Sequence, residues 1–337
     1  MNEVRFVDRA EELKALREWC LRRRATPLYV YGPEGCGKTR LLKELVRRFS
    51  SLTSAGAIAV YIDALEAESV DKAILTPRSI QLSREVLASI AEKYTGLTVG
   101  EALSRSISAI LEKAILKRRM RGNYVLVAVD DVARAIGLDR VEWYVKWLYE
   151  LMWKLRESYQ PEAINFIVTT SEGESLELIS RHRHALIKLL WNLEEKAFRE
   201  LAQELNPPES LDLEHVWKLT GGNPGKLIEI AEHFTWDTAR WLESIREKLK
   251  PIARKILERN LTQELKLIVE DPDSIWHKPS PKMGELYQLL AAANLVIYKG
   301  FTAVSEAKVP MNLELGIGED YAWQIPAYRK ALEDILK

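Results

Sequence analysis

The sequence predicts an α/β fold in which a parallel β-sheet flanked by helices is followed by an all-helical region and a small α+β unit. The first observation is a set of nearly continuous apolar runs, typical of strands buried on both faces of a parallel sheet. These runs cover residues 28–31, 57–62, 124–129, 164–168 and, as a fifth candidate strand, 185–190. The second is helical periodicity between the runs, at about 80–94, 99–121 and 139–158. Strands that alternate with helices indicate a parallel α/β sheet.

Length and composition argue against a disordered, collagen-like or coiled-coil chain. A chain of 337 residues is long enough for two or three domains, and 47% apolar and 29% charged residues are typical of a globular protein. The 49 Lys and Arg residues balance the 49 Asp and Glu residues, so affinity for nucleic acid has to come from a local patch. Two cysteines, a charged N-terminus and no long apolar stretch predict a cytoplasmic protein without structural disulfides, export signal or membrane span.

The pattern changes to helices alone after about residue 193. Helices are predicted at 194–205, 211–219, 224–234 and 236–269, the last one broken at Pro251. A proline-rich link at 271–281 is typical of a domain boundary or a surface loop. Beyond it the sequence predicts a helix at 283–294, strands at 295–299 and 321–325, and a helix at 327–336. This order is compatible with a winged helix, and we expect three domains, at 1–192, 193–270 and 271–337.

A phosphate-binding motif stands between the first strand and the first helix. The segment GPEGCGKT fits the pattern GxxxxGK[ST]. Glycines at these positions allow positive φ angles, so that successive N–H groups converge on phosphate oxygens at the start of a helix. Lys38 is expected to reach the β- and γ-phosphates, and Thr39 is expected to bind Mg²⁺. The predicted nucleotide-binding residues of this segment are Gly32, Pro33, Glu34, Gly35, Cys36, Gly37, Lys38, Thr39 and Arg40.

Two acidic residues follow the third apolar run. The sequence YVLVAVDDV ends a buried strand in Asp130 and Asp131, and we expect this strand to lie beside the strand that precedes the phosphate loop. Asp130 would hold Mg²⁺, directly or through water, and Asp131 would orient the attacking water. The alternative is that these acids begin a loop or cap a helix. Since Asp is one methylene shorter than Glu, hydrolysis that depends on Asp131 is expected to be slow.

Further candidates for catalysis lie near the last two runs. Thr169, Thr170 and Ser171 follow the fourth run, and we select Thr170 to hydrogen-bond the γ-phosphate or its attacking water, although threonine is also ordinary in strands. Arg181 and Arg183 precede the fifth run, where an arginine could stabilise transition-state charge within the chain or across a subunit contact. A solvated basic turn explains these two arginines equally well.

Four segments together resemble a known family. The segment FVDRAEELKAL at 6–16, the phosphate loop, the VDD strand end and TGGNPGKL at 220–227 occur in this order. They are similar to the archaeal ATPases of the STAND branch of the AAA+ proteins, relatives of the initiator ATPases that recognise replication origins. The resemblance covers residues 3–235. It implies an AAA+-like sheet domain and a helical lid, often followed in this family by a C-terminal winged helix.

The resemblance also implies roles for residues outside the phosphate loop. Phe6, Val7 and Arg9 lie in the segment that helps to enclose adenine in the family, and Pro224 stands where the lid reports the nucleotide. Many AAA+ proteins carry a sensor arginine in that region, which is missing here. Lys226 is a candidate to substitute for its charge, although a lysine in the first turn of an exposed helix is usually solvated. Because the sensor arginine is missing and the second acid is Asp rather than Glu, we expect a nucleotide-controlled switch rather than a motor.

These observations predict a Mg²⁺-dependent P-loop protein that binds ATP or ADP, hydrolyses ATP slowly and acts as a switch, with duplex DNA as a partner of its C-terminal domain. One alternative is a DNA-binding module that uses ATP as a structural ligand. Another is a signalling scaffold that forms a homo-oligomer or recruits a protein partner, with Arg181 or Arg183 completing a neighbouring site. We expect no membrane partner.

Overall fold

The computed structural model describes residues 6–49, 56–64, 74–75, 122–170 and 173–336. These residues form two compact units. The sheet unit consists of Arg9–Tyr31 and Lys38–Lys188, and the helical unit consists of Gly32–Gly37, Leu189–Lys337 and the residues before Arg9. The phosphate-binding motif therefore belongs to both units: its first six residues are part of the helical unit, and its last two begin a helix of the sheet unit.

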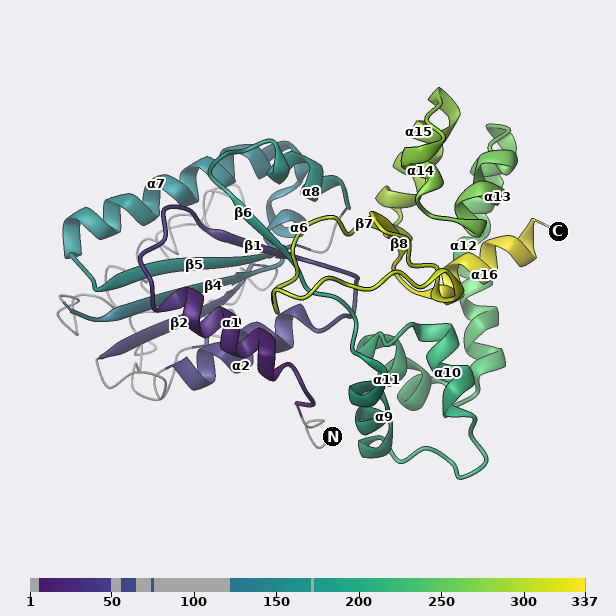
Figure 1. The fold of residues 1–337 in the computed structure, drawn as a ribbon, viewed down its shortest axis with the longest axis horizontal. Coiled ribbons are helices and arrows are strands. Elements are labelled where there is room, and N and C mark those ends of the chain that lie inside the picture. Colours follow the sequence, from purple (N-terminus) through teal and green to yellow (C-terminus); the bar gives the residue numbers. More distant parts are fainter. Residues whose placement is uncertain (1–5, 50–55, 65–73, 76–121, 171–172, 337) are drawn as a thin grey trace, which may run out of the picture. The chain divides into compact units, whose positions relative to one another are not determined.

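The sheet unit contains six strands in the order β3-β2-β4-β5-β1-β6 (Figure 1). Neighbouring strands are parallel in the pairs β2–β4, β4–β5 and β5–β1, whereas β3 is antiparallel to β2. The strands are β1 (Leu28–Tyr31), β2 (Ala57–Asp63), β3 (Ile74–Leu75), β4 (Tyr124–Asp130), β5 (Ala163–Thr170) and β6 (Leu186–Leu189). The five predicted strands are confirmed as β1, β2, β4, β5 and β6, with ends that differ by at most two residues.

One expectation about the sheet is wrong. The strand that ends in Asp130, β4, does not lie beside β1, because β5 lies between them. The register pairs Tyr31 of β1 with Thr170 of β5, and Val129 of β4 with Val168 of β5. The order of strands along a chain does not fix their order in a sheet, since a crossover connection can leave a position that a later strand fills. The carboxyl end of β5 is therefore the one that adjoins both β1 and β4.

Helices cover both faces of the sheet. The helices α1 (Ala10–Cys20) and α2 (Lys38–Phe49) run along one face, and α7 (Val141–Tyr159) runs along the other (Figure 1). Three short helices complete the described part of the unit, namely α6 (Val132–Ile136), η2 (Leu138–Arg140) and α8 (Gly173–Ser180). Helices on both faces explain why the apolar runs of the central strands are continuous rather than alternating. The predicted helices at 80–94 and 99–121 lie outside the described residues.

The helical unit continues the chain with helices after β6, as predicted. These are α9 (Glu195–Glu204), α10 (Leu213–Thr220), α11 (Pro224–His233) and α12 (Thr238–Glu258). The predicted break at Pro251 is wrong, because α12 continues through this proline. A proline removes one helical hydrogen bond, and the burial of Trp241 and Ile256 on either side of Pro251 holds the helix to the core. None of the described helices combines the length and the hydrophobicity needed to cross a lipid bilayer.

The C-terminal part combines helices with a pair of strands. After α12 come α13 (Thr262–Glu270), α14 (Ser274–His277), α15 (Pro281–Ala292), the antiparallel strands β7 (Val296–Tyr298) and β8 (Tyr321–Trp323), and α16 (Pro326–Ile335). One hydrophobic core joins these elements to α9–α12, and its buried members include Trp241, Leu286 and Leu332. The predicted order of helix, two strands and helix is confirmed, and the division into three domains stays a prediction.

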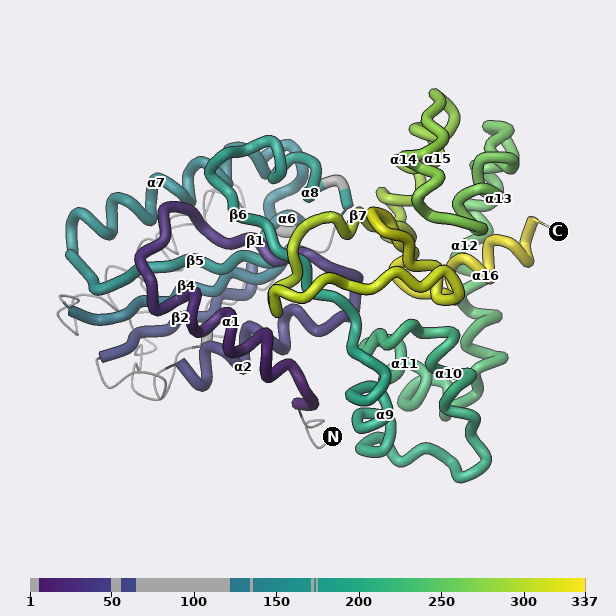
Figure 2. Tube along the Cα trace, viewed as in Figure 1, coloured from purple at the N-terminus to yellow at the C-terminus, as the bar shows by residue number. Residues whose placement is uncertain are grey.

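The proline-rich link is a surface segment only in part, because residues 272–274 are buried whereas residues 276–281 are exposed. Asp273 is 4% exposed, and its carboxylate accepts hydrogen bonds from the backbone N–H groups of Asp320 at 2.9 Å, Tyr321 at 2.8 Å and Glu319. It therefore holds the end of the long β7–β8 connection, whose course is visible in Figure 2. A carboxylate that accepts several backbone hydrogen bonds in a buried position is a structural element, and proline content alone did not reveal it.

Replacing Asp273 with alanine is expected to destabilise the helical unit. The substitution leaves three backbone N–H groups without their acceptor, and each such loss costs about 1–3 kcal/mol. We expect the free energy of unfolding, measured by urea denaturation, to fall by about 3 kcal/mol or more. Glu319→Ala is the matched control, because its side chain is exposed in the same connection, and it should cost less than about 0.5 kcal/mol. Equal stabilities of the two variants would contradict this role of Asp273.

Candidate nucleotide-binding site

The phosphate loop joins β1 to α2 with the backbone that its motif requires. Gly35 has a φ of 82° and Gly37 a φ of 100°, values that residues with a side chain rarely adopt. Such turns bring successive N–H groups to one side and form an anion-binding concavity at a helix N-terminus. Lys38 begins α2 and is buried, whereas Thr39 is exposed and Arg40 is half-buried. The segment thus combines backbone donors with one buried ammonium group.

The first residues of the loop pack against the segment that follows β6. Gly32, Pro33 and Cys36 are buried, whereas Glu34 is exposed. The Cys36 thiol donates a hydrogen bond to the carbonyl oxygen of Leu190 at 3.4 Å. This cysteine therefore contributes a small buried group that supports the loop from within the helical unit.

The turn that carries Pro224 also packs against the loop. Asn223 is the N-cap of α11 and Pro224 is the first residue of that helix. The N–H of Gly225 donates a hydrogen bond to the carbonyl oxygen of Gly35 at 3.0 Å, and the ring of Pro224 lies beside Gly37. Pro224 thus lies against the phosphate loop within the helical unit, and its role in reporting the nucleotide stays a prediction.

Lys226, in the first turn of α11, is paired with an acid. Its Nζ atom lies 2.7 Å from Oε2 of Glu229, and both side chains are 20% exposed. Burial lowers the pKa of Lys226, but Tyr328 and Glu229 outweigh this effect, so that the net shift of the pKa is upward. The charge of this lysine is therefore compensated inside the helical unit.

A hydrogen-bonded group of side chains surrounds Asp130 at the carboxyl end of β4. Asp130 is 3% exposed. The Tyr61 hydroxyl donates to its Oδ2 atom at 2.8 Å, and the Thr169 hydroxyl donates to its Oδ1 atom. The Thr169 oxygen in turn accepts a hydrogen bond from the N–H of Asp131 at 3.0 Å. Both carboxylate oxygens of Asp130 therefore have protein donors, which offsets the cost of burying the charge and fixes the orientation of the carboxylate.

Tyr61 is a member of this group that the sequence reasoning missed. The strands β2 and β4 are parallel neighbours with Asp63 opposite Asp130, so Tyr61 lies close to the end of the strand beside the acid. Burial raises the pKa of Tyr61 well above its ordinary value, and the charge of Asp130 raises it further. The phenol therefore stays protonated and remains a donor at neutral pH. The signal was that AIAVYID and YVLVAVD both end in an acid, which suggests strands in register.

Asp131 occupies an unusual turn between β4 and α6. Its φ is 53° and its ψ is 39°, in the left-handed region that few residues other than glycine adopt. It stands at the N-cap position of α6, yet its side chain accepts no capping hydrogen bond. Helix capping therefore does not account for this half-buried acid, and its role as the residue that orients water stays a prediction.

The two threonines at the end of β5 make different contacts. Thr169 bonds the acid group, whereas the Thr170 hydroxyl hydrogen-bonds with the hydroxyl of Ser175 in α8. Neighbouring residues of a strand point to opposite faces, so only one of the two can meet the acids. Thr170 was the residue predicted from the sequence to act in catalysis, and this role stays a prediction. Ser171 lies outside the described residues.

The two candidate arginines lie on the surface of the sheet unit. Arg181 forms an ion pair with Glu177 one helical turn earlier, and its side chain is 59% exposed. Arg183 is exposed as well. Among the described residues, neither arginine forms a hydrogen bond or an ion pair with the side chains that surround Asp130. Their role in stabilising the charge of the transition state stays a prediction.

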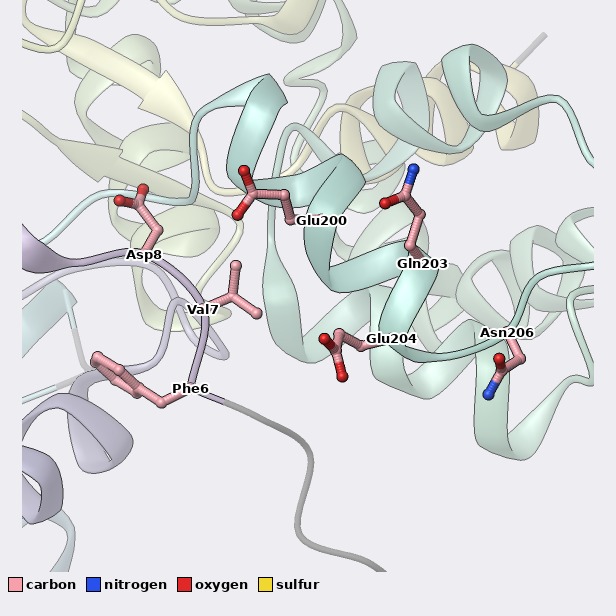
Figure 3. Close-up of a pocket in the computed structure, with 7 residues that line it drawn as sticks. All are labelled: Phe6, Val7, Asp8, Glu200, Gln203, Glu204 and Asn206. Atoms are coloured by element: carbon pink, nitrogen blue, oxygen red, sulfur yellow. The ribbon is translucent and has the colours of Figure 1, made fainter.

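Phe6 and Val7 line a pocket of about 600 Å³ in the helical unit. Figure 3 shows Val7 directed towards α9, whereas the Phe6 ring is directed away from that helix. The other lining residues are Asp8, Glu200, Gln203, Glu204 and Asn206. Three carboxylates in one pocket disfavour an anionic phosphate and favour a neutral or amino-bearing group.

Arg9 belongs to the sheet unit and pairs with an acid of that unit. It precedes α1 with a φ of 66°, and its buried guanidinium lies 2.8 Å from Oε1 of Glu12. Arg9 belongs to the sheet unit, whereas Phe6 and Val7 belong to the helical unit. The residues that the resemblance groups around adenine are thus divided between the two units.

The model of an ATPase domain predominantly from Archaea matches residues 6–230 of the chain. This region includes the phosphate loop, the acid group after β4 and the turn that begins α11. None of the curated proteins compared with the chain matches it.

Several solved structures share a remote likeness with the chain. The ORC2 protein of Aeropyrum pernix, in ADPNP-ADP complexes, is 16% identical, and the match covers 99% of this chain and 96% of that chain with a TM-score of 0.44. A DNA replication initiation factor is 16% identical, with coverage of 84% and 81% and a TM-score of 0.34. The FIGL-1 AAA domain is 14% identical with a TM-score of 0.34, over 65% of this chain and 63% of that chain, which is less than two thirds of its length.

The family model extends over well more than half of the sequence and includes the motif residues described above. The chain therefore belongs to the family of ATPase domains found predominantly in Archaea.

Proposed function

We propose that this protein binds ATP together with Mg²⁺, hydrolyses it slowly and acts as a nucleotide-controlled switch. The observation that carries the proposal is the GPEGCGKT loop, in which two left-handed glycines precede a buried lysine at the first position of α2. Backbone N–H groups, the positive end of the helix dipole and an ammonium group all favour negative charge. Membership of the ATPase-domain family supports the same function.

The pocket beside Phe6 and Val7 supports ATP rather than a simple polyphosphate as the ligand. Gln203 offers both a donor and an acceptor, and Glu200 and Glu204 offer acceptors for an exocyclic amino group such as that of adenine. The negative charge of this pocket disfavours phosphate, whereas the phosphate loop favours it, so the two places have different roles in binding. The resemblance to the archaeal ATPases agrees with this division of roles.

The hydrogen-bonded side chains around Asp130, together with Asp131, support hydrolysis. Asp130 and Thr39 carry the oxygen ligands that a hydrated Mg²⁺ ion prefers, and such an ion, when bound, neutralises charge that develops on the phosphates. Tyr61 and Thr169 hold the Asp130 carboxylate in one orientation. Lys38 stabilises the negative charge of the phosphates, and the Asp131 carboxylate accepts a hydrogen bond from the attacking water. Thr170, Arg181 and Arg183 remain candidates for the same step.

The switch follows from the contact between the loop and α11. A ligand shifts a conformational equilibrium only by its different affinity for the two states. Gly225 bonds Gly35 inside the phosphate loop, so a change in the loop on nucleotide binding has a direct mechanical effect on α11. The missing sensor arginine and the short acid Asp131 favour long-lived states over rapid turnover.

Lys38→Ala is expected to weaken ATP binding at least about a hundredfold and to abolish phosphate release, because it removes the one positively charged side chain of the GPEGCGKT segment. Isothermal titration calorimetry and a phosphate-release assay measure the two effects. Lys14→Ala is the matched control, since Lys14 is an exposed lysine of α1, and it should behave as the wild type. Wild-type affinity in the Lys38 variant would contradict the proposed site.

Asp131→Asn is expected to reduce the rate of hydrolysis by about 100-fold or more while ATP affinity changes less than about threefold, as expected for a group that acts on the attacking water. Single-turnover phosphate release with saturating Mg²⁺ measures this separation. Asp139→Asn, an exposed acid of the same unit, serves as the control. A variant at position 131 that hydrolyses ATP at the wild-type rate would exclude Asp131 from this role.

Duplex DNA is a second candidate ligand because basic and aromatic side chains gather before and within the first turn of α15. Trp276 is 68% exposed, and Lys278 and Lys282 are also exposed. Since the net charge of the chain is zero, such a local cluster is what DNA binding requires. The winged-helix resemblance of this region agrees with the location.

A double substitution of Lys278→Glu and Lys282→Glu is expected to weaken binding to duplex DNA at least about tenfold and to flatten its dependence on salt, because each phosphate contact contributes a slope of about 0.9. Fluorescence anisotropy at several salt concentrations measures both quantities. The control carries Lys255→Glu and Lys266→Glu, two exposed lysines of α12 and α13. Equal effects of the two pairs would argue against a DNA site at α15.

A further inference from the structure

The peptide group of Glu34, in the middle of the phosphate loop, is held by side-chain amides on both sides. Its N–H donates a hydrogen bond to Oε1 of Gln324 at 2.8 Å, and its carbonyl oxygen accepts one from Nδ2 of Asn223 at 2.9 Å. Gln324 lies 290 positions after Glu34 in the chain and directly follows β8. The loop is therefore anchored to the C-terminal part of the helical unit.

The two amides that hold Glu34 are buried, and a third buried amide, that of Asn192, links the residues that carry them. Asn192, Asn223 and Gln324 are 5%, 0% and 2% exposed. Asn192 accepts a hydrogen bond from Asn223 Nδ2 at 2.9 Å and donates one to the backbone carbonyl of Gln324 at 3.0 Å. The side chains of Asn192 and Asn223 therefore hold each other, and Asn192 also holds the backbone of Gln324, so that the residues around the loop are fixed in position.

This support controls the direction of the carbonyl groups of the loop. A phosphate site needs converging N–H groups, and a carbonyl oxygen aimed at the anion would repel it. The Glu34 carbonyl is bonded to Asn223 and the Gly35 carbonyl is bonded to Gly225. Gly225 approaches so closely that a Cβ atom on it would lie 2.9 Å from the Cα atom of Gly35. Two successive carbonyls are thus engaged with α11 and cannot turn towards an anion while these bonds persist.

Gln324 is suited to this task because its own position is fixed. Its backbone N–H donates to the carbonyl oxygen of Leu295 at 2.9 Å, and its neighbours Trp323 and Ile325 are each 1% exposed. Within the described part of the chain, its side-chain Nε2 atom has no hydrogen-bond partner. The hydrogen bond that the side chain does make is the one to Glu34, so this buried amide serves the loop rather than the local fold of β8.

We propose that Gln324 is a positioning residue for the phosphate loop, and that through it the junction between β8 and α16 is coupled to nucleotide binding. The inference rests on the proposed function and adds the regulation of that site. Gln324 does not touch the nucleotide in this account. It acts by holding the Glu34 peptide, and because coupling between two sites is reciprocal, nucleotide in the loop must in turn stabilise the β8–α16 junction.

The test compares ATP binding by the wild type, Gln324→Met and Gln288→Met. Methionine keeps the length of the side chain but offers no oxygen acceptor to Glu34. We expect the dissociation constant for ATP, measured by calorimetry well below the unfolding temperature, to rise about tenfold in Gln324→Met, as expected for the loss of one acceptor from a part-buried N–H group. Gln288 is exposed on α15, so the same change there should leave the constant within about twofold.

Hydrogen exchange separates positioning from general support of the fold. In the wild type, ATP is expected to slow the exchange of backbone amides in peptides that cover residues 321–328, and this protection is expected to be lost in Gln324→Met. The wild-type measurement keeps the proposal testable even where the variant is unstable. ATP that saturates the wild type without protecting 321–328, or a folded Gln324→Met variant with wild-type affinity, would overturn the inference.

The failure of the proposed function gives a different result. If the wild type and Lys38→Ala both fail to bind ATP, the nucleotide site itself is wrong and the inference about Gln324 falls with it. If Lys38→Ala loses binding while Gln324→Met retains it, the nucleotide site stands and the positioning role alone is wrong.

Discussion

In the backbone between Gly32 and Lys38, the N–H groups that bind an anion must face it, whereas the carbonyl oxygens must face away from it. The residues around the loop hold the carbonyl oxygens in that direction. An anion-binding turn directs its N–H groups to the ligand, so its carbonyl oxygens need partners elsewhere. In this chain Asn223 and Gly225 supply those partners, and Gln324 accepts the N–H of Glu34. Glycine-rich turns have the greatest backbone freedom and hold no single conformation by themselves. The helical unit therefore supplies the rigidity that the loop sequence lacks.

The buried carboxylate at the end of β4 in the sheet unit is likewise held by side-chain hydrogen bonds. The buried carboxylate of Asp130 receives hydrogen bonds from Tyr61 and Thr169, which makes its charge tolerable and its orientation defined. The phosphate loop and the Asp130 carboxylate are each held by side chains that are distant in sequence. A change at either place thus breaks several hydrogen bonds at once, which favours a few discrete states over continuous adjustment. This property agrees with the proposed role as a switch.

The sheet and the phosphate loop were predictable because their signals are local. Continuous apolar runs gave β1, β2, β4, β5 and β6, and the motif located the turn with Gly35 and Gly37. The order of β4 and β5 was not predictable, because sheet order depends on crossovers and not on chain order. Tyr61 and Gln324 were missed for a related reason: their partners lie 69 and 290 positions away, and neither residue stands in a motif. Asp273 was hidden by the prolines around it, which indicated a loop although the carboxylate is buried.

We propose above all that the turn between β1 and α2 binds the triphosphate of a nucleotide. The most direct measurement is calorimetric titration of the folded wild-type chain with Mg²⁺-ATP, with a titration of adenosine alone in the same buffer. We expect saturable one-site binding of ATP, with a dissociation constant at least about a hundredfold lower than that of adenosine, because the phosphates carry the charge that the loop recognises. Equal affinities for ATP and adenosine, or no binding of ATP at millimolar concentration, would contradict it.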